Sequence, residues 1–580
     1  MKKKVLSILL AATFTVSMLA GCGSSTATDD GAAKKEDAAD DAGKKDTASD
    51  GEFNITVNLA SEPQTMDPTL STSLDAGTMA HHLFEGLMKW EDSGKETNGS
   101  DGTANSAALV PGQAESYEKV ANDDGTVTYT FKLRDGIKWS DGQDVTANDF
   151  EYAWKRLVNP ETAADYSYML DCVVNAQDII DGNKSADELA VKAVDDKTFE
   201  VTLVNDLPYF EELCAFPAMM PVRQDMIEKG GDQWTFNVDT YISNGAYKMK
   251  EWTHNSQIVV EKNENYYDFE NLGPETITFK LMDNQNAMLS GFKSGELDFI
   301  QDAPQAEITS LIASGDMKIV DYIGTYYVCF QTEKEPFNDP KVRKAFSLAI
   351  DREDVAKSIY FNTMDPAYGW VPDGVSTGEA GIYRDQVEEP MKAMYETEDP
   401  KALLLKGMEE LGLGDDPSTL TITFTLGDTN QWIKNYGEYY QQKFKEVLGV
   451  NVVLDFNEWG TFLSKTNAGE YQMGYMVWGI DYNDPYAMLS LMTSTSTAIP
   501  TFWSNEKYDE LMAKASVEMD DVKRQELCAE AEKILMESAP ICPVVNEASN
   551  TYRYKYVHNN NTMSFTSTGL KDTYISGRNA

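Results

Sequence analysis

The sequence predicts a protein of the mixed α/β class that folds into two or three domains. At 580 residues the chain is longer than one ordinary hydrophobic core supports, and its hydrophobic content of 42% is ample for several packed cores. Segments in which apolar and polar residues alternate, as in strands, are mixed with segments in which apolar residues recur at helical spacing. An α+β unit without a strict βαβ rhythm is inserted in the first half, and a strand–helix–strand series follows in the second.

The first predicted element is an alternating strand at residues 53–59, followed by a turn at 62–68. Apolar residues then recur at helical spacing, at Met79, Leu83, Leu87 and Met88. His81 and His82 lie in this segment, but neighbours in sequence do not share a helix face. We therefore expect no shared metal site there.

The inserted unit contains two strand signals and one helix. Residues 127–133 alternate as a strand, and Asp135-Gly136 is a turn pair. A helix is predicted at about 147–157 and a second hairpin at 197–204. The remaining elements are short strands and amphipathic helices, predicted as strands at 246–249, 258–260, 276–279, 419–426 and 450–455, and as helices after Pro340, at 400–412, at about 439–448 and around 527–535.

The N-terminus has the pattern of an export signal. Lys2, Lys3 and Lys4 precede an apolar run at 5–20, which is short for a membrane span. The run ends in Leu19-Ala20-Gly21-Cys22, which looks like a bacterial lipobox, so we expect cleavage before Cys22 and a diacylglycerol anchor on it. An ordinary signal with a chance cysteine is the alternative. Residues 22–52 are polar and are expected to form a disordered tether between the anchor and the globular part.

Charge and motifs exclude several classes of function. The net charge of −46 argues against nucleic acid and anionic lipid surfaces as partners. Catalytic serine, zinc-protease, phosphate-loop and dinucleotide motifs are missing from the sequence, and we expect no cofactor. The five cysteines after Cys22 have no C-x-x-C spacing, so no zinc site is expected. Their pairing cannot be read from the sequence.

The stretch from Met476 to Pro485 is the main candidate for a binding site. It passes from an apolar segment that contains Trp478 into carboxylates and an Asn-Asp-Pro turn, which places Asp481 at the end of a buried element. A carboxylate in water-poor surroundings strongly prefers a cationic partner. The structural alternative is that Asp481 caps backbone amides in a turn.

Several stretches together carry a resemblance to a known family. They are 62–68 (EPQTMDP), 131–142 (FKLRDGIKWSDG), 145–150 (VTANDF), 243–247 (SNGAY), 336–345 (PFNDPKVRKA) and 478–485 (WGIDYNDP). In this order they resemble the family 5 extracellular solute-binding proteins, and among them the oligopeptide-binding proteins of ABC importers. The similarity runs from about residue 53 to the end.

The resemblance implies a two-lobed fold of the type II periplasmic binding proteins, with three domains and a hinged ligand cleft. Domain I is expected to gather 53–84, 222–323 and 549–580. Domain II is expected as an insertion at 85–221, and domain III at 324–548.

The resemblance also implies a binding site. Asp481 is expected to hold the α-ammonium of a peptide, and the backbone at Trp478 and Gly479 to pair with the peptide main chain. Further lining residues implied in this way are Trp459, Tyr322, Tyr327, Tyr166 and Leu74. Where relatives offer arginines to the peptide carboxylate this chain has Thr466 and Tyr475, and Lys334 remains as a possible partner. Two positions that form a disulfide in those relatives are Gly324 and Gly479 here.

The expected function is that of a lipid-anchored, extracytoplasmic and monomeric carrier. It would deliver oligopeptides to an ABC permease of the cell membrane, without catalysis. The same scaffold could carry another solute, such as an oligosaccharide or a nickel chelate. A glycan-hydrolysing enzyme is the alternative from a different class, because paired carboxylates beside aromatic residues also suit sugars.

Overall fold

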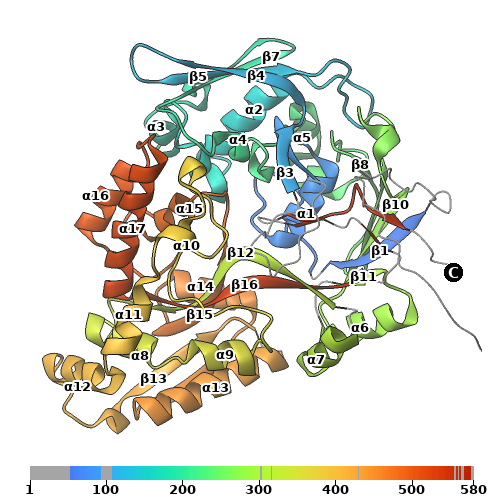
Figure 1. Cartoon of the computed structure of the whole chain (residues 1–580). Coiled ribbons are helices and arrows are strands. Elements are labelled where there is room, and N and C mark those ends of the chain that lie inside the picture. The colour runs from blue at the N-terminus through green and yellow to red at the C-terminus, as the bar shows by residue number, and fades with distance from the viewer. Residues whose placement is uncertain are drawn as a thin grey trace, which may run out of the picture. The chain divides into compact units, whose positions relative to one another are not determined.

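The computed structural model describes residues 53–59, 61–92, 107–300, 303–314, 317–428, 430–553, 557–558, 561–563 and 567–575. The largest sheet of this part has ten strands, in the order β14-β13-β15-β12-β16-β11-β1-β10-β9-β8 (Figure 1). Its strands are β1 (Asn54–Leu59), β8 (Tyr247–Thr253), β9 (Gln257–Lys262), β10 (Thr276–Leu281), β11 (Phe299–Ile300), β12 (Met317–Phe330), β13 (Thr421–Leu426), β14 (Asn451–Phe456), β15 (Met473–Gly479) and β16 (Ile541–Arg553).

Two long antiparallel strands, β12 and β16, connect the two halves of this sheet. β12 also pairs with β15 on one side, and β16 also pairs with β11 on the other. They cross the middle of Figure 1, between the half that contains β1 and β10 and the half that contains β13 and β15. The two halves are therefore one hydrogen-bonded surface that narrows to these two crossing strands.

The half that contains β1 is built as its alternation predicts. Ile55 and Val57 on β1 and Ile277 and Phe279 on β10 are buried, and the two strands are parallel in register. The helix α1 (Leu74–Leu83) begins after Ser73, whose hydroxyl accepts the Ala76 N–H. Two further helices in this half are α6 (Gln285–Ser294) and α7 (Gln305–Ser314).

The inserted unit carries a separate antiparallel sheet in the order β4-β5-β7-β6. The strands are β4 (Ala114–Ala121), β5 (Val127–Leu133), β6 (Val191–Asp195) and β7 (Thr198–Leu203), and β2 (Met88–Asp92) pairs separately with β3 (Ala107–Pro111). Alternate residues of β5 are buried, and α2 (Ala147–Val158) packs against β6 and β7, where Trp154 meets Phe199 of β7 edge to face at 5.2 Å. The smaller helices of the unit are α3 (Ala176–Ile180) and α4 (Phe210–Leu213), with a 3₁₀ helix η1 at Asp165–Leu170, and α5 (Gln224–Gly230) follows directly after the unit.

The half that contains β15 is mainly helical around its strands. Its helices are α8 (Pro340–Leu348), α9 (Arg352–Ser358), α10 (Tyr383–Gln386), α11 (Pro390–Thr397), α12 (Pro400–Glu410), α13 (Gln431–Val447), α14 (Trp459–Asn467), α15 (Pro485–Leu489), α16 (Glu506–Ala515) and α17 (Asp521–Ser538). Three of them, α8, α12 and α15, begin with an Asp-Pro pair. The aspartate caps free backbone N–H groups, and the proline occupies the first helical position, where no N–H is needed.

Most predicted elements are confirmed, with two differences in extent. α1 ends at Leu83, and Leu87 lies outside it while Met88 begins β2. A Cβ at Gly86 would lie 2.3 Å from the Cys214 carbonyl, so the chain leaves the helix to pass close to another backbone. α13 begins at Gln431, because Asn430 caps it well before the apolar residues from which the helix was predicted.

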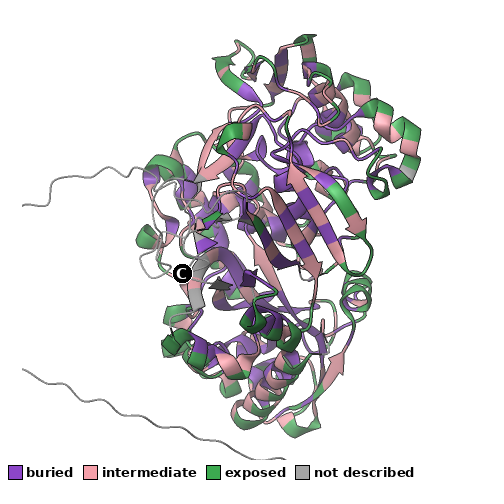
Figure 2. Ribbon diagram, turned by 90° about the vertical axis from the view of Figure 1, so that its right-hand side faces the viewer, coloured by how far each residue is buried: buried purple, intermediate pink, exposed green. Residues whose placement is uncertain are grey.

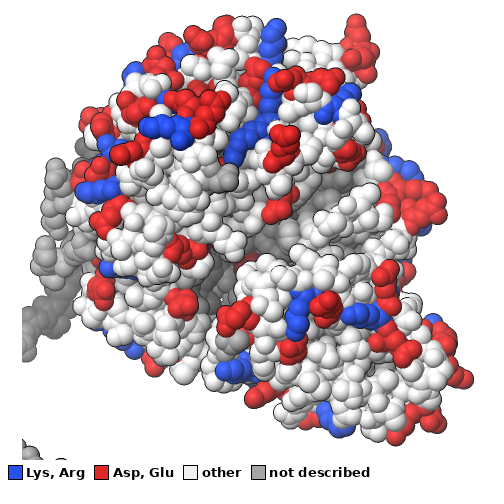
Figure 3. Space-filling view, turned by 180° about the vertical axis from the view of Figure 1, so that it is seen from behind, with Lys and Arg blue, Asp and Glu red and all other residues white. Residues whose placement is uncertain are grey.

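Short pairs near the C-terminus complete the described strands: β17 (Val557–His558) with β20 (Tyr574–Ile575), and β18 (Asn561–Met563) with β19 (Ser567–Gly569). Buried residues follow the strands and the inner faces of the helices, whereas exposed residues lie on the outer faces (Figure 2). Acidic and basic side chains are interspersed over the face in Figure 3. Among the described residues, no helix is long and apolar enough to cross a membrane.

Candidate functional site

Asp481 lies just beyond the end of β15, where the chain leaves the sheet. The N–H of Ile480 donates to the Ile323 carbonyl at 2.8 Å and fixes the strand end against β12. Three residues after Asp481, Asp484 caps α15 and contacts Arg524 at 3.1 Å. The structure thus separates the two acids: Asp484 has the capping role, while Asp481 accepts no hydrogen bond of ordinary geometry from a described backbone N–H.

A small cavity lies beside the Asp481 side chain. Its lining residues are His81, Trp90, Glu212, Ala215, Phe216, Pro217 and Asp481. They come from α1, β2, the segment around α4 and the turn after β15. The cavity therefore lies between the inserted unit and the half that contains β15, where a bound molecule would touch both.

The Asp481 carboxyl is in surroundings that disfavour its charge. The residue as a whole is partly exposed, but burial of the carboxyl raises its pKa to about 7, an effect that the Trp478 and Tyr168 side chains partly offset. Among the described residues it forms no ion pair with a lysine, arginine or histidine. His81 lines the same cavity, but burial lowers the pKa of His81 to about 3, so its ring is neutral. A cationic ligand would supply the missing partner.

Aromatic side chains form one wall around Asp481. Tyr166 on η1 meets Phe216 edge to face at 5.0 Å, and Phe216 lines the cavity. Burial raises the pKa of Tyr166, and the Asp481 charge raises it further. Tyr322 on β12 is affected in the same way, by burial first and then by Glu547 and Asp481. These hydroxyls stay protonated at neutral pH and can donate hydrogen bonds.

Gly324 and Gly479 face each other across β12 and β15. A Cβ on Gly479 would lie 2.7 Å from the Tyr322 ring, and a Cβ on Gly324 would lie 2.4 Å from Oε2 of Glu547. The space that side chains would fill at these two positions is thus taken by a phenol ring and a carboxyl group.

The open edge of β15 is the second feature of the site. β15 pairs with β13 only at Met473 and Gly474. Beyond Gly474 no strand of the described part is paired with β15 on that side, although β12 continues on the other side to Gly479. Tyr475 to Gly479 therefore present a strand edge that leads to Asp481.

Glu212 and His81 were missed by the sequence analysis as site residues. Oε2 of Glu212 accepts the Asn483 N–H at 2.7 Å, and burial raises the pKa of Glu212 to about 7. Beside it Tyr209 stacks on Tyr482 with ring centroids 4.2 Å apart. No local motif marks these residues, because they reach the site only through the fold.

The other predicted lining residues are dispersed. Trp459 begins α14 and is 52% exposed, and Leu74 begins α1 and is 60% exposed. Tyr327 is buried against Trp370, at 4.9 Å between ring centroids. Lys334 is partly buried and forms no ion pair with a described residue. The structure brings Asp481, Trp478, Gly479, Tyr322 and Tyr166 together; Cys22 lies outside the described residues.

The two positions that replace arginines of relatives are in the core. Thr466 is buried on α14, and its hydroxyl donates to the Phe462 carbonyl at 3.0 Å. Tyr475 is buried, and its ring stacks on Tyr436 at 3.9 Å. Neither residue offers a charge to a ligand carboxylate.

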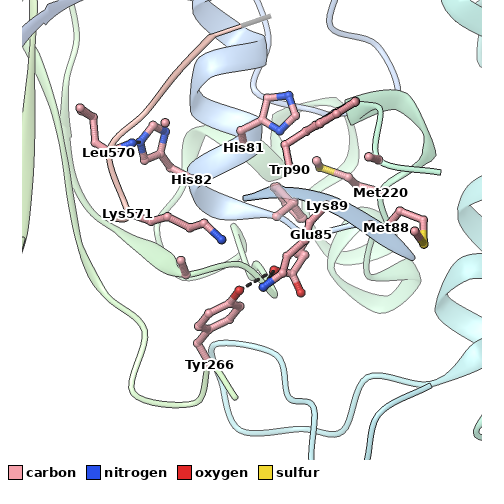
Figure 4. A pocket seen from close by; sticks show the side chains of 15 residues that line it. His81, His82, Glu85, Met88, Lys89, Trp90, Met220, Tyr266, Leu570 and Lys571 are labelled. Carbon is pink, nitrogen blue, oxygen red and sulfur yellow. Dashed lines mark hydrogen bonds and ion pairs between the residues drawn. The ribbon is translucent and has the colours of Figure 1, made fainter. Parts of the chain in front are cut away.

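A second cavity adjoins the first and shares His81, Trp90 and Ala215 with it (Figure 4). Its polar groups already have partners: Glu85 accepts the Tyr266 hydroxyl at 2.5 Å and Gln113 Nε2 at 2.9 Å, and Lys89 pairs with Glu91. Burial lowers the pKa of His82 to about 4. Among the described residues, no group of histidine, cysteine and carboxylate side chains is arranged to hold a metal ion.

All five cysteines of the described part, which are Cys172, Cys214, Cys329, Cys528 and Cys542, are buried and unpaired. The structure thus gives the pairing that could not be read from the sequence: none of these five cysteines forms a disulfide.

The fold is that of the type II periplasmic binding proteins, in which two lobes enclose a ligand cleft. The sequence profile of the bacterial extracellular solute-binding proteins, family 5, matches residues 108–499, and the chain belongs to this family. The oligopeptide-binding protein OppA of Bacillus subtilis is 31% identical over 94% of each chain.

Two solved structures bear on the conformation. Haemophilus influenzae OppA in complex with RPPGFSPFR is 30% identical and matches with a TM-score of 0.80, over 91% of this chain and 99% of that one. The unliganded open form of the murein tripeptide-binding protein MppA is 29% identical and matches with a TM-score of 0.64, over 91% and 98%. The structure thus resembles the peptide-bound form more than the open one.

Proposed function

We propose that the protein binds oligopeptides in its cleft and that Asp481 holds the peptide α-ammonium. The observation that carries this proposal is the Asp481 carboxyl itself, which burial drives toward neutrality and which has no cationic partner in the described part of the chain. A fixed carboxylate makes the burial of an ammonium tolerable and rejects ligands that lack one.

The open edge of β15 supports binding of the ligand main chain. An extended peptide could add as a strand beside Tyr475 to Gly479, with its amino end at Asp481. Hydrogen bonds to the main chain give affinity without reading side chains, which suits a carrier for peptides of varied sequence. The names of its relatives, an oligopeptide-binding and a murein tripeptide-binding protein, agree with this class of ligand.

We propose further that three domains build the cleft, with boundaries at 53–84 with 222–323 and 549–580, at 85–221, and at 324–548. The division into sheets supports these boundaries, since the four-stranded sheet lies wholly within 85–221. β12 and β16 span the other two boundaries, at 323/324 and 548/549.

The carrier would work outside the cytoplasm as a monomer, anchored by lipid at Cys22, and deliver ligand to an ABC permease without chemical change. The lipobox and the polar tether support the anchor. The family supports transport rather than catalysis.

Calorimetry with free and N-acetylated tetra-alanine tests the proposal. The free peptide should bind and the acetylated one should bind at least about thirtyfold more weakly, because acetylation removes the charge that Asp481 requires. Equal affinity for both forms would refute the role of Asp481 and leave the peptide assignment without its physical basis.

A further inference from the structure

Glu547 lies on β16 opposite an irregularity in β12. Asp321 pairs with Ala548 and Thr325 with Asn546, so the three residues from Tyr322 to Gly324 face the single residue Glu547. Such a bulge changes the direction of the side chains where the hydrogen bonds between the two strands are interrupted. It lies on the two strands that join the halves of the large sheet, beside the end of β15.

Two acceptor oxygens converge above Gly324. A Cβ built on Gly324 would lie 2.4 Å from Oε2 of Glu547 and 2.8 Å from the carbonyl oxygen of Trp478, so both oxygens lie close to one point. Any larger residue at position 324 would push the carboxyl away. A charged group with several N–H donors, such as an ammonium, is the chemical complement of a carboxylate oxygen beside a carbonyl oxygen.

Glu547 has no partner in the described part of the chain. It takes part in no hydrogen bond or ion pair there, and burial alone raises its pKa to about 8. The residue as a whole is half-buried, so water can satisfy the protonated carboxyl until a ligand displaces it.

The surroundings connect Glu547 with the proposed peptide site. The Tyr322 side chain senses the charges of both Glu547 and Asp481, and its ring packs against Gly479. The indole Nε1–H of Trp478, on β15, is buried and makes no hydrogen bond of ordinary geometry, and the indole lies close enough to Asp481 to lower the pKa of that carboxyl. Two carboxyl groups without a cationic partner thus line one stretch of wall.

We propose that Glu547 forms a second cation subsite, which selects peptides that carry a lysine or arginine side chain close to the amino terminus. The proposal rests on the proposed function, since it assumes a peptide whose α-ammonium lies at Asp481. It adds a side-chain preference to a site that otherwise recognises only the main chain and its charged end.

The test compares lysine with norleucine, which has a similar aliphatic chain without the charge. Each replaces one of the first three residues of tetra-alanine, and affinities for the full-length protein are measured by calorimetry. At one of the three positions lysine should be preferred by about thirtyfold or more. Glu547→Gln should reduce this ratio to near one and change the affinity for the norleucine peptide less than about threefold.

A charge-matched control is Glu409→Gln, which removes an exposed acid on α12 and should leave the ratio unchanged. A second readout needs no variant. At pH 7 a Glu547 carboxyl that is protonated in the free protein must release its proton to an incoming ammonium, so the lysine peptide should release more protons than the norleucine peptide. The titratable groups that face Glu547 are Tyr322 and Tyr360, and burial holds both protonated, while Asp481 contributes equally with either peptide.

The outcomes separate the two proposals. If tetra-alanine binds but lysine and norleucine are bound equally at all three positions, the Glu547 subsite is refuted and the peptide function stands. If the lysine preference persists in Glu547→Gln, another group reads the charge and the assignment is again refuted. If none of the peptides binds, the proposed function fails and the subsite fails with it.

Discussion

The backbone N–H of Asn483 donates a 2.7 Å hydrogen bond to Oε2 of Glu212, a residue 271 positions earlier in the chain. The bond joins the inserted unit to the turn after β15, two residues from Asp481. Burial raises the pKa of Glu212 to about 7, and Asp484 and Glu211 add to this effect. Closing the cleft over Glu212 therefore favours its protonated form.

This contact predicts that the closed form of the protein becomes less stable as pH rises. An acid whose pKa is raised from 4.5 to about 7 in the closed form stabilises that form below pH 4.5, and the contribution is lost as pH rises through about 7. Glu212→Gln keeps the acceptor without the charge. Its affinity for peptide should lie within about fivefold of the wild type at pH 5 and exceed it about tenfold or more at pH 8.

Calorimetry at the two pH values measures this ratio, with Glu115→Gln on β4, an exposed acid of the same unit, as the control. A variant that binds more weakly than the wild type at pH 8 would show instead that the charge of Glu212 helps to hold the closed form.

Asp481→Asn should remove the counter-ion of the peptide ammonium while it keeps the shape of the side chain. The expected cost is about 2–5 kcal/mol, or roughly thirtyfold to several thousandfold in affinity. The loss should lie mainly in the dissociation rate, since one charge hardly alters a net charge of −46.

A double cycle with free and acetylated peptide measures the coupling. Acetylation should weaken the wild type strongly and Asp481→Asn much less, because both changes remove the same interaction. Asp415→Asn, at an exposed position, is the matched control. If the effects of Asp481→Asn and of acetylation on the binding free energy are additive, Asp481 does not interact with the peptide amine.

Acidity should weaken binding through Asp481. In the closed form without ligand, burial raises the pKa of Asp481 to about 7, and a bound ammonium lowers it, so the affinity of this form for the ammonium is retained above about pH 7 and lost as pH falls below that value. The loss should approach about tenfold per pH unit. Affinities at pH 5.5, 6.5 and 7.5 in the Glu212→Gln background isolate the effect, and a flat profile there would contradict an ionised Asp481.

The predicted anchor is tested by Cys22→Ser. The tether at 22–52 is acidic and polar, so without lipid nothing in it should hold the protein to a membrane. We expect the variant in the soluble fraction and the wild type with membranes, as followed by fractionation and immunoblotting. Firm membrane association of the variant would mean that another feature anchors the protein.

Local physical chemistry accounts for the elements that were predicted well. The Asp-Pro pairs at 339–340, 399–400 and 484–485 each begin a helix, because capping and the fixed φ of proline act within one turn. The alternation of 127–133 and 276–279 marks strands with one buried face. Met88 was placed in a helix by its spacing, but a long-range backbone contact at Gly86 ends that helix earlier.

The site was predictable only in part. Asp481 follows an apolar strand, so its position was readable, and the resemblance supplied its role. Glu212 and Glu547 come from remote segments of the chain. No local sequence pattern marks them, because only the fold places these two acids where they have no counter-ion. Trp459 is 52% exposed, so its place in the ligand pocket stays a prediction.

The burial of all five thiols in the described part affects how the protein can be handled. A buried thiol with a raised pKa reacts slowly, and burial raises the pKa of each one. None of the described cysteines then requires an oxidant, and reducing agents leave the folded part intact. With the proposed lipid anchor, a thiol that reacts quickly in native protein would be that of Cys22 molecules without lipid. Labelling with a maleimide therefore counts the unprocessed fraction of a preparation directly.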